Sequence, residues 1–190
     1  MRRATSPAVF EPSVPTQLLA RFRVALGWVV APLVLIVAQP TAGSIAVGMS
    51  IAAVGEGLRV WAAGHLNKAR EVTSSGPYRW FAHPLYVGSS IMGAGLGIAS
   101  HSLIVIGLIA LYLGLTLRAA VASEEAYLRR TFGDQYDLYR QGVQHRARTG
   151  DGRRPFSLAR AFANREHRAV IGLVVVVLLL VLKATYNGTL

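Results

Sequence analysis

The stretch VIGLVVVVLLLVL, residues Val170–Leu182, contains no charged or hydrogen-bonding side chain. With its neighbours it approaches the ~20 apolar residues that an α-helix needs to cross the hydrocarbon core of a bilayer. The whole chain of 190 residues is 53% hydrophobic and only 15% charged, whereas soluble domains carry about 25% charged residues. The stretch and the composition together predict a chain that is embedded in lipid.

Further apolar runs lie N-terminal to this stretch. The short polar breaks Gln39-Pro40 and Ser100-His101-Ser102 divide them into pairs. We therefore predict an all-α, polytopic membrane protein with about five transmembrane helices. The predicted helices cover Val24–Ala38, Ala42–Ala63, Pro84–Ala99, Leu103–Leu117 and a terminal helix at 169–186.

The basic residues are distributed unevenly along the chain. There are 20 Lys plus Arg against 9 Asp plus Glu, a net charge of +11, and nearly all the basic residues lie in 1–23, 64–84 and 118–168. The connections 39–42 and 100–102 carry none. The positive-inside rule then predicts a cytoplasmic N-terminus, an external C-terminus and a cytoplasmic position for both polar segments that could support chemistry. We expect the excess charge to contact anionic lipid headgroups and not nucleic acid.

The chain contains no cysteine. This excludes disulfides, thiolate metal sites and a cysteine nucleophile. The histidines show no spacing typical of metal ligands, so no metal site is predicted. They are His65, His83, His101, His145 and His167.

The first polar pattern that could support chemistry is GPYRWFAHPLYVG, residues 76–88. Proline is favoured at the first position of a helix, so Pro84 predicts a helix N-terminus there. His83 and the nearby backbone amides then lie at the positive end of a helix, which attracts a carboxylate or phosphate. The alternative is a loop that only caps a membrane helix and places its aromatic residues at the bilayer interface.

The second pattern is EEAYLRRTFGDQYDLY, residues 124–139. It follows the fourth apolar run, on a helix that we expect to continue out of the bilayer. Glu125, Leu128 and Phe132 fall on one face of such a helix. Taken alone, the glutamates and the neighbouring arginines are better explained as a solvated ion-pair surface.

The two patterns together resemble the isoprenylcysteine carboxyl methyltransferase and phospholipid methyltransferase superfamily of integral membrane methyltransferases. The spacing that carries the resemblance is G-P-Y-x-x-x-x-H-P-x-Y-x-G, a helical hairpin, and then E-E-x-x-L-x-x-x-F-G-x-x-Y-x-x-Y. It covers residues 54–143 and includes Gly57-Leu58-Arg59-Val60-Trp61. The family usually has arginine immediately before the His-Pro pair, where this chain has Ala82.

The resemblance implies methyl transfer from S-adenosylmethionine to a lipophilic acceptor at the cytoplasmic face of the membrane. The acceptor would be an isoprenylcysteine-like carboxylate or a phospholipid headgroup. We expect a single integral membrane domain over residues 1–190. Within it we expect an irregular tail at 1–17 and the signature region at 76–139.

The resemblance also implies roles for individual residues. The amides around His83 to Tyr86 would bind the cofactor carboxylate, Glu125 its ribose hydroxyls, and Tyr86 and Tyr136 its adenine and sulfonium. The full set of predicted cofactor-binding residues is Tyr78, His83, Leu85, Tyr86, Gly88, Glu125 and Tyr136.

Catalytic roles are predicted for Arg118 and Glu124, and acceptor binding for Glu56 and Arg59. Arg118 would orient an anionic acceptor, or would serve only as a positive-inside anchor. Glu56 and Arg59 are three residues apart in the second apolar run, so an intrahelical ion pair is the alternative to acceptor binding. Charges within a membrane segment are costly and usually mark function or a buried pair.

Two further patterns concern packing and the membrane surface. Ser89, Gly93 and Gly97 recur every four residues and predict close packing of the third helix against the fourth helix or another protomer. The basic segment Arg140–Arg168 includes Phe156 and Phe162, which predict either an interfacial helix or a plain linker.

Two other functions remain as alternatives. One is an NADPH-dependent membrane reductase of the sterol-reductase type. The other is a non-catalytic membrane scaffold that retains the fold, which Ala82 makes conceivable. The patterns do not identify the acceptor or the oligomeric state.

Overall fold

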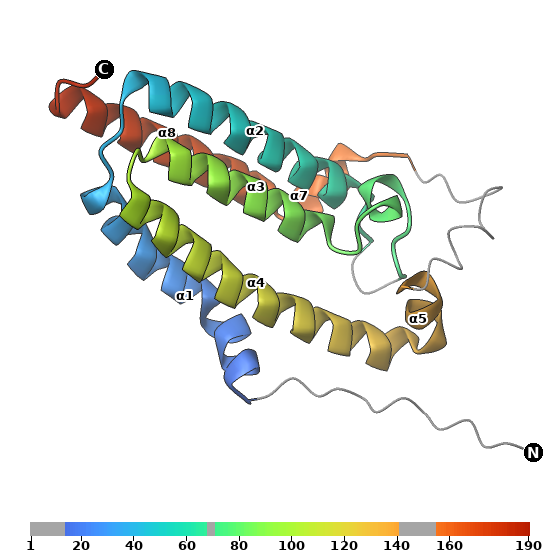
Figure 1. Cartoon of the computed structure of the whole chain (residues 1–190). Coiled ribbons are helices and arrows are strands. Elements are labelled where there is room, and N and C mark those ends of the chain that lie inside the picture. The colour runs from blue at the N-terminus through green and yellow to red at the C-terminus, as the bar shows by residue number, and fades with distance from the viewer. Residues whose placement is uncertain (1–13, 68–70, 141–154) are drawn as a thin grey trace, which may run out of the picture.

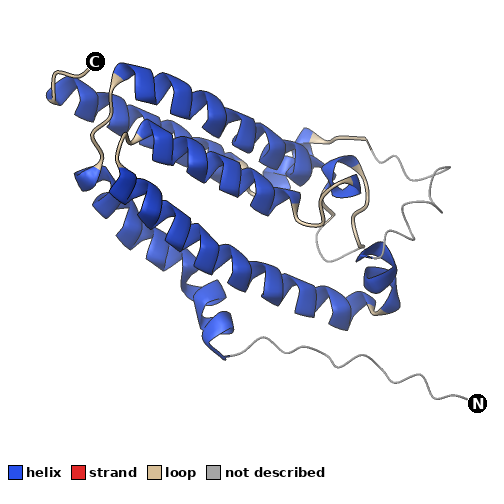
Figure 2. Cartoon of the chain, in the orientation of Figure 1, coloured by secondary structure: helices blue, strands red, loops and turns tan. Residues whose placement is uncertain are grey.

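The computed structural model describes residues 14–67, 71–140 and 155–190, and these residues form helices and connecting loops without a strand (Figure 2). The elements are α1 (Val14–Val37), α2 (Ala42–His65), the 3-10 helix η1 (Gly76–Arg79), α3 (Pro84–Ala99), α4 (Leu103–Phe132), α5 (Asp134–Arg140), α7 (Leu158–Ala163) and α8 (His167–Tyr186).

The long helices run side by side along one common direction (Figure 1). Three of them, α2, α4 and α8, are long and apolar enough to cross a membrane, and shorter apolar helices span Ala25–Val37 and Pro84–Ala99. The prediction of an all-α polytopic membrane protein is confirmed. The end of the bundle at which α3 begins and α5 lies is called the His83 end below.

Two helix boundaries refine the predictions. α1 begins at Val14, so the irregular tail predicted for residues 1–17 is wrong for 14–17; residues 1–13 lie outside the described part. Pro15 is tolerated there because N–H groups in the first turn of a helix have no acceptor within the helix, so the N–H that proline lacks is not needed. α4 continues beyond the apolar run as predicted, and with 30 residues it reaches about 45 Å. It therefore extends well past a hydrocarbon core of about 30 Å.

The backbones of α2 and α3 lie in direct contact. A Cβ atom added to Gly55 would lie 2.5 Å from the Met92 nitrogen and 2.6 Å from the Gly88 oxygen, and one added to Gly95 would lie 2.5 Å from the Ala52 nitrogen. Side chains are therefore excluded at these positions. Such close approach lets dispersion hold helices together in lipid, where burial of apolar surface supplies no driving force.

The opposite face of α3 packs against α4. A Cβ on Gly93 would overlap Leu113, and one on Gly97 would lie 3.1 Å from the side chain of Ile106. The predicted contact with the fourth helix is confirmed for Gly93 and Gly97, whereas Ser89 accepts a hydrogen bond from Arg59 of α2. From their connection at residues 100–102 the two helices diverge toward the His83 end (Figure 1).

Polar contacts fasten the first and last helices to this core. Lys183 of α8 donates to the carbonyl oxygens of Leu35 and Ile36 at 2.5 and 2.7 Å, which completes the C-terminus of α1. At the His83 end, Asn164 donates to the carbonyl oxygens of Ala63 and Leu66 and closes α2. Both contacts supply a donor to carbonyl oxygens at the end of a helix, which accept no N–H from within that helix.

The basic segment contains a short helix. Ser157 caps α7 by accepting from the Arg160 amide, while the side chains of Phe156, Leu158 and Phe162 are exposed. These apolar side chains next to arginines fit the interfacial helix that the sequence predicts. Residues 141–154 of the segment lie outside the described part.

The α2–α3 contact predicts different effects at two neighbouring glycines. Gly55→Ala should destabilise the protein by about 1–3 kcal/mol, because the added methyl overpacks a backbone contact. Gly57→Ala is the control, since a Cβ at Gly57 meets nothing within 4 Å, and alanine has the higher helix propensity. Thermal unfolding in detergent measures both variants. Equal unfolding temperatures would show that the contact does not limit stability.

Candidate functional site

The loop before α3 is a compact turn. Gly76 has φ of +58°, and a Cβ there would lie 2.5 Å from the His65 ring, so both the backbone conformation and the space require glycine. Pro77 and Tyr78 are buried in η1. Pro84 occupies the first turn of α3, with His83 as its N-cap residue. The loop therefore fixes the His83 side chain at the N-terminus of α3, as predicted.

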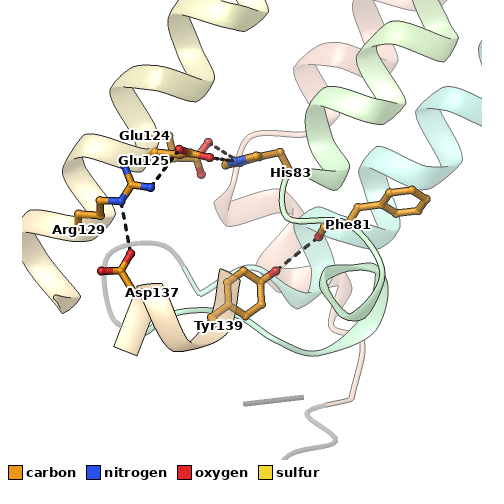
Figure 3. A network of polar contacts seen from close by, with 7 residues as sticks. All are labelled: Phe81, His83, Glu124, Glu125, Arg129, Asp137 and Tyr139. Carbon is orange, nitrogen blue, oxygen red and sulfur yellow. Dashed lines mark hydrogen bonds and ion pairs between the residues drawn. The ribbon is translucent and has the colours of Figure 1, made fainter. Parts of the chain in front are cut away.

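His83 bridges two adjacent glutamates of α4 (Figure 3). Its Nε2 lies 3.3 Å from Glu125 Oε1 and its Nδ1 lies 3.6 Å from Glu124 Oε2. The ring stacks on Tyr86, with 5.7 Å between the ring centroids. The structure thus brings together the His-Pro pattern and the Glu-Glu pattern. In the sequence, His83 and Glu125 are 42 residues apart.

The two carboxylates change the protonation of the site. Burial alone lowers the pKa of His83, but hydrogen bonding and charge from Glu124 and then Glu125 outweigh it, so the pKa is raised above the usual value. For Tyr78, burial, followed by the negative charge of Glu124, raises the pKa of the phenol. The cluster therefore keeps the Tyr78 phenol neutral, and its carboxylates favour the protonated form of His83 over the neutral form.

α5 folds back over the cluster. Arg129 joins the two helices, with its Nη2 3.8 Å from Glu125 Oε2 and its Nε 3.5 Å from Asp137 Oδ1. The Tyr139 hydroxyl donates to the Tyr78 carbonyl oxygen at 2.9 Å. These contacts hold α5 against both α4 and the loop before α3 (Figure 3).

A cavity of about 860 Å³ lies between α1, α3, α4 and α8. Its walls deep in the bundle are apolar, with Val34, Leu96, Ile109 and Leu180 among them. Toward the His83 end it becomes polar and aromatic. Six of the seven tyrosines of the chain line it, namely Tyr78, Tyr86, Tyr112, Tyr127, Tyr136 and Tyr139.

A second cavity of about 680 Å³ lies on the other side of the gap between α3 and α4. Its lining includes His83, Glu125, Arg118 and Trp80, and Trp80 is 67% exposed. The two cavities share three lining residues, Ala82, Tyr86 and Leu117. The residue before the His-Pro pair therefore contributes only a methyl group where the cavities meet.

The predicted site residues divide between these cavities. The larger one is lined by Tyr78, Leu85, Tyr86, Tyr136, Glu124 and Arg59. The smaller one is lined by His83, Tyr86, Glu125 and Arg118. Gly88 and Glu56 line neither of these cavities. Gly88 lies against Arg59 and Gly55, and Glu56 is 6% exposed beside Arg59.

The predicted intrahelical pair is present and belongs to a larger network. Arg59 Nε lies 3.4 Å from Glu56 Oε2, and Arg59 Nη2 lies 2.6 Å from Glu166 Oε1. Arg59 Nη1 also donates to Ser89. Sequence reasoning missed Glu166, because it precedes α8 in the chain and no spacing links it to α2. The network joins α2, α3 and α8 through one guanidinium.

Sequence reasoning also missed three tyrosines that line the larger cavity: Tyr112, Tyr127 and Tyr139. Tyr112 offered a signal, since it is the one aromatic residue in the apolar run Leu103–Leu117. Among the residues that the structure describes, no group of three or more His, Asp or Glu side chains is placed to hold a metal ion.

The His83 bridge predicts a pH dependence of stability. A histidine in an unfolded chain titrates near about 6.5, and the folded pKa of His83 lies above its usual value. Stabilisation by the bridge is therefore complete below the unfolded pKa and is lost as the pH rises through the folded pKa. We expect the unfolding temperature in detergent to fall over this range, and to fall less in His83→Asn. His101→Asn, an exposed site at the far connection, is the control. Parallel pH profiles for wild type and His83→Asn would refute the bridge.

Comparison with known proteins gives three relatives. The nickel-cobalt-cadmium resistance protein NccN of Alcaligenes xylosoxydans xylosoxydans is 31% identical, over 74% of this chain and 72% of the relative. The cobalt-zinc-cadmium resistance protein CzcN of Cupriavidus metallidurans is 36% identical, over 45% of this chain and 39% of the relative. The protein-S-isoprenylcysteine O-methyltransferase of Schizosaccharomyces pombe is 34% identical, over 40% of this chain and 33% of the relative.

No solved structure matches the chain. The model of the phospholipid methyltransferase family matches residues 35–135, which contain α2, α3, the whole His-Pro pattern and α4 with both glutamates. The match covers more than half of the chain and includes the bridge between His83 and the two glutamates. The chain therefore belongs to the phospholipid methyltransferase family of membrane proteins.

Proposed function

We propose that this protein transfers a methyl group from S-adenosylmethionine to a lipophilic acceptor, at the end of the bundle that the positive-inside rule assigns to the cytoplasm. Membership of a methyltransferase family supports the reaction class. The observation that carries the proposal is the meeting of two cavities beside the His83 bridge. One cavity is aromatic and acidic at its polar end and continues into an apolar interior.

The described residues fit the cofactor. S-adenosylmethionine presents a carboxylate, ribose hydroxyls, an adenine and a cationic sulfonium, and the volume of the larger cavity lies within the ~300–1,000 Å³ of small-molecule sites. The first turn of α3 offers the Leu85 amide to the carboxylate, since the Tyr86 and Val87 amides donate to the His83 carbonyl oxygen. Glu125 can accept from ribose hydroxyls, and tyrosine rings such as Tyr86 and Tyr136 suit a sulfonium through cation–π attraction.

The full assignment keeps the predicted cofactor residues and adds a structural role for one of them. Tyr78, Leu85, Tyr86 and Tyr136 would contact the cofactor from the larger cavity, and His83 and Glu125 from the smaller one. Gly88 would act indirectly, since its lack of a side chain lets the Arg59 side chain lie against α3. S-adenosylmethionine supplies the methyl group.

The apolar interior of the larger cavity would hold the hydrocarbon chain of the acceptor. Leu96 and Ile109 lie deep in this interior, while Glu124 lines its polar end. An acceptor whose hydrocarbon chain lies against Leu96 and Ile109 would bring its headgroup to the polar end of the cavity, beside the cofactor. Holding the two reactants in line is the main catalytic task in such a displacement, and well-oriented groups gain effective molarities of about 10⁵ M or more.

The predicted catalytic pair lies on two sides of α4. Glu124 faces the larger cavity and Arg118 the smaller one. Arg118 would bind an anionic part of the headgroup from the smaller cavity. Arg59 would line the acceptor site, and Glu56 would hold Arg59 in place through their ion pair.

Two of the relatives are named for resistance to nickel, cobalt, zinc and cadmium. The described residues offer no cluster of metal ligands, so direct metal binding gains no support from this part of the chain.

Cofactor binding tests the proposal directly. We expect the purified protein to bind S-adenosylhomocysteine in calorimetric titration, and Glu125→Ala to weaken binding at least tenfold, or about 1.4 kcal/mol. Asp134→Asn is the control, because Asp134 is exposed on α5 and lines neither cavity. A folded sample that binds NADPH instead would favour the reductase. One that binds neither ligand would favour the scaffold.

The acceptor site is tested by filling the apolar interior. Leu96→Trp should reduce methylation of long-chain lipids at least tenfold without changing S-adenosylhomocysteine affinity, because indole occupies the space of the chain. Ile98→Trp, on the exposed side of the same helix, should leave methylation unchanged. Radiolabelled methyl transfer into lipid extracts measures both. Equal activities would place the acceptor outside the larger cavity.

A further inference from the structure

A titratable side chain that lines the smaller cavity contacts a carboxylate that lines the larger one. His83 is 13% exposed and faces a carboxylate from each of its ring nitrogens. Glu124, on the Nδ1 side, lines the larger cavity, and Glu125, on the Nε2 side, lines the smaller one. The three side chains form a continuous polar chain from one cavity to the other (Figure 3).

This arrangement depends on consecutive residues of a helix. Neighbours on an α-helix project about 100° apart, so Glu124 and Glu125 can serve opposite sides of the gap between α3 and α4. His83 lies at the non-helical N-cap of α3, which points its ring across the gap. An ordinary ion pair needs one carboxylate, and a second carboxylate on the opposite nitrogen creates a path for a proton.

The charged and titratable groups around His83 come from every element packed there. α4 supplies Glu124, Glu125, Arg129 and Arg118, which lines the smaller cavity together with His83. α5 supplies Asp137, which shares Arg129 with Glu125. The neutral neighbours are Tyr86 of α3, which stacks on the ring, Tyr78 of η1, and Tyr139 of α5, whose hydroxyl binds a loop carbonyl. Negative charge exceeds positive charge among these groups, so the site attracts protons and cations.

We propose that Glu124, His83 and Glu125 form a proton relay across the wall, and that the methyl acceptor is therefore a protic nucleophile, an amine, hydroxyl or thiol. This inference rests on the proposed methyl transfer. It adds a role for the bridge beyond cofactor binding, and it defines the acceptor by the chemistry of its reacting atom.

The proton balance of the relay is simple. The bond between the acceptor atom and its proton breaks, and the proton moves to Glu124. The electron pair left on the acceptor atom forms the bond to the methyl carbon, while the bond from that carbon to the sulfonium sulfur would break with its electron pair left on sulfur. His83, neutral and protonated at Nε2, accepts the Glu124 proton at Nδ1 and passes its Nε2 proton to Glu125. Glu125 then releases one proton to water in the smaller cavity, beside the exposed Trp80.

A carboxylate acceptor would not need this relay. It carries no proton at neutral pH, and it would approach two carboxylates at the junction. Ala82 contributes no positive charge there to offset them. An ammonium, hydroxyl or thiol instead arrives with a proton to lose and meets groups that accept it.

Histidine NMR tests the relay without any turnover. In ¹³C-histidine-labelled protein, the His83 signal is assigned by its absence in His83→Gln, and its titration is followed in detergent. We expect Glu124→Gln and Glu125→Gln each to lower the midpoint by about 1 pH unit or more. Asp134→Asn is the control. If the titration midpoint of His83 is unchanged in either glutamate variant, His83 is not shared between the two carboxylates, and the relay is overturned.

Turnover then separates the relay from cofactor binding. With amine, hydroxyl and thiol lipids as probes, His83→Gln should lower kcat about 100-fold, and added imidazole should restore part of it. A merely structural role would show no such rescue. Methylation of carboxylate lipids alone, by an enzyme that binds S-adenosylhomocysteine, would overturn the relay but leave the proposed function. Absence of that binding in the wild type would overturn the proposed function itself, whatever the histidine titration shows.

Discussion

The contact between the backbones of α2 and α3 determines the position of everything at the site. Gly55, Gly88 and Gly95 leave no room for side chains between the two helices, so α3 is held rigidly against α2 along its length. α4 meets α3 through Gly93 and Gly97 near their connection and diverges from it toward the His83 end (Figure 1). In lipid, where apolar burial does not drive helices together, this choice of small residues decides which helices touch and which separate.

The divergence of α3 and α4 creates the two cavities, and polar contacts keep it from closing. His83 reaches across the gap to Glu124 and Glu125, and α5 supports the same place through Arg129 and Tyr139. Every one of these contacts lies beyond the apolar part of α4. The length of α4 carries the carboxylates past a hydrocarbon core of about 30 Å, to the end of the bundle where we propose that the cofactor binds.

The charges inside the bundle are paired, as their cost in a membrane demands. Arg59 is shared by Glu56, Glu166 and Ser89, and Lys183 completes the C-terminus of α1. The Arg59 network has one more carboxylate than cation, and it fixes the start of α8 beside the larger cavity. The last helix thus contributes Val176 and Leu180 to the cavity wall, although the residues matched by the family model end at 135.

The sequence alone determined the helical membrane class, the helix order and the family. Apolar runs of sufficient length have few alternatives in a bilayer, and the His-Pro and Glu-Glu patterns are specific when they occur together. It also predicted the Glu56–Arg59 pair and close helix packing through Gly93 and Gly97, since both depend on spacing within one helix. The neighbour of these glycines stayed open between the fourth helix and another protomer. The single-domain assignment and the roles of the site residues stay predictions.

Only the tertiary structure decided how these pieces combine. The gap between α3 and α4, the separate cavities faced by Glu124 and Glu125, the gathering of six tyrosines and the capture of Arg59 by Glu166 all depend on how far apart helices lie and how they are rotated. Spacing within a helix shows which residues share a face. It does not show which neighbour that face meets, because the meeting of faces is a property of the packed bundle.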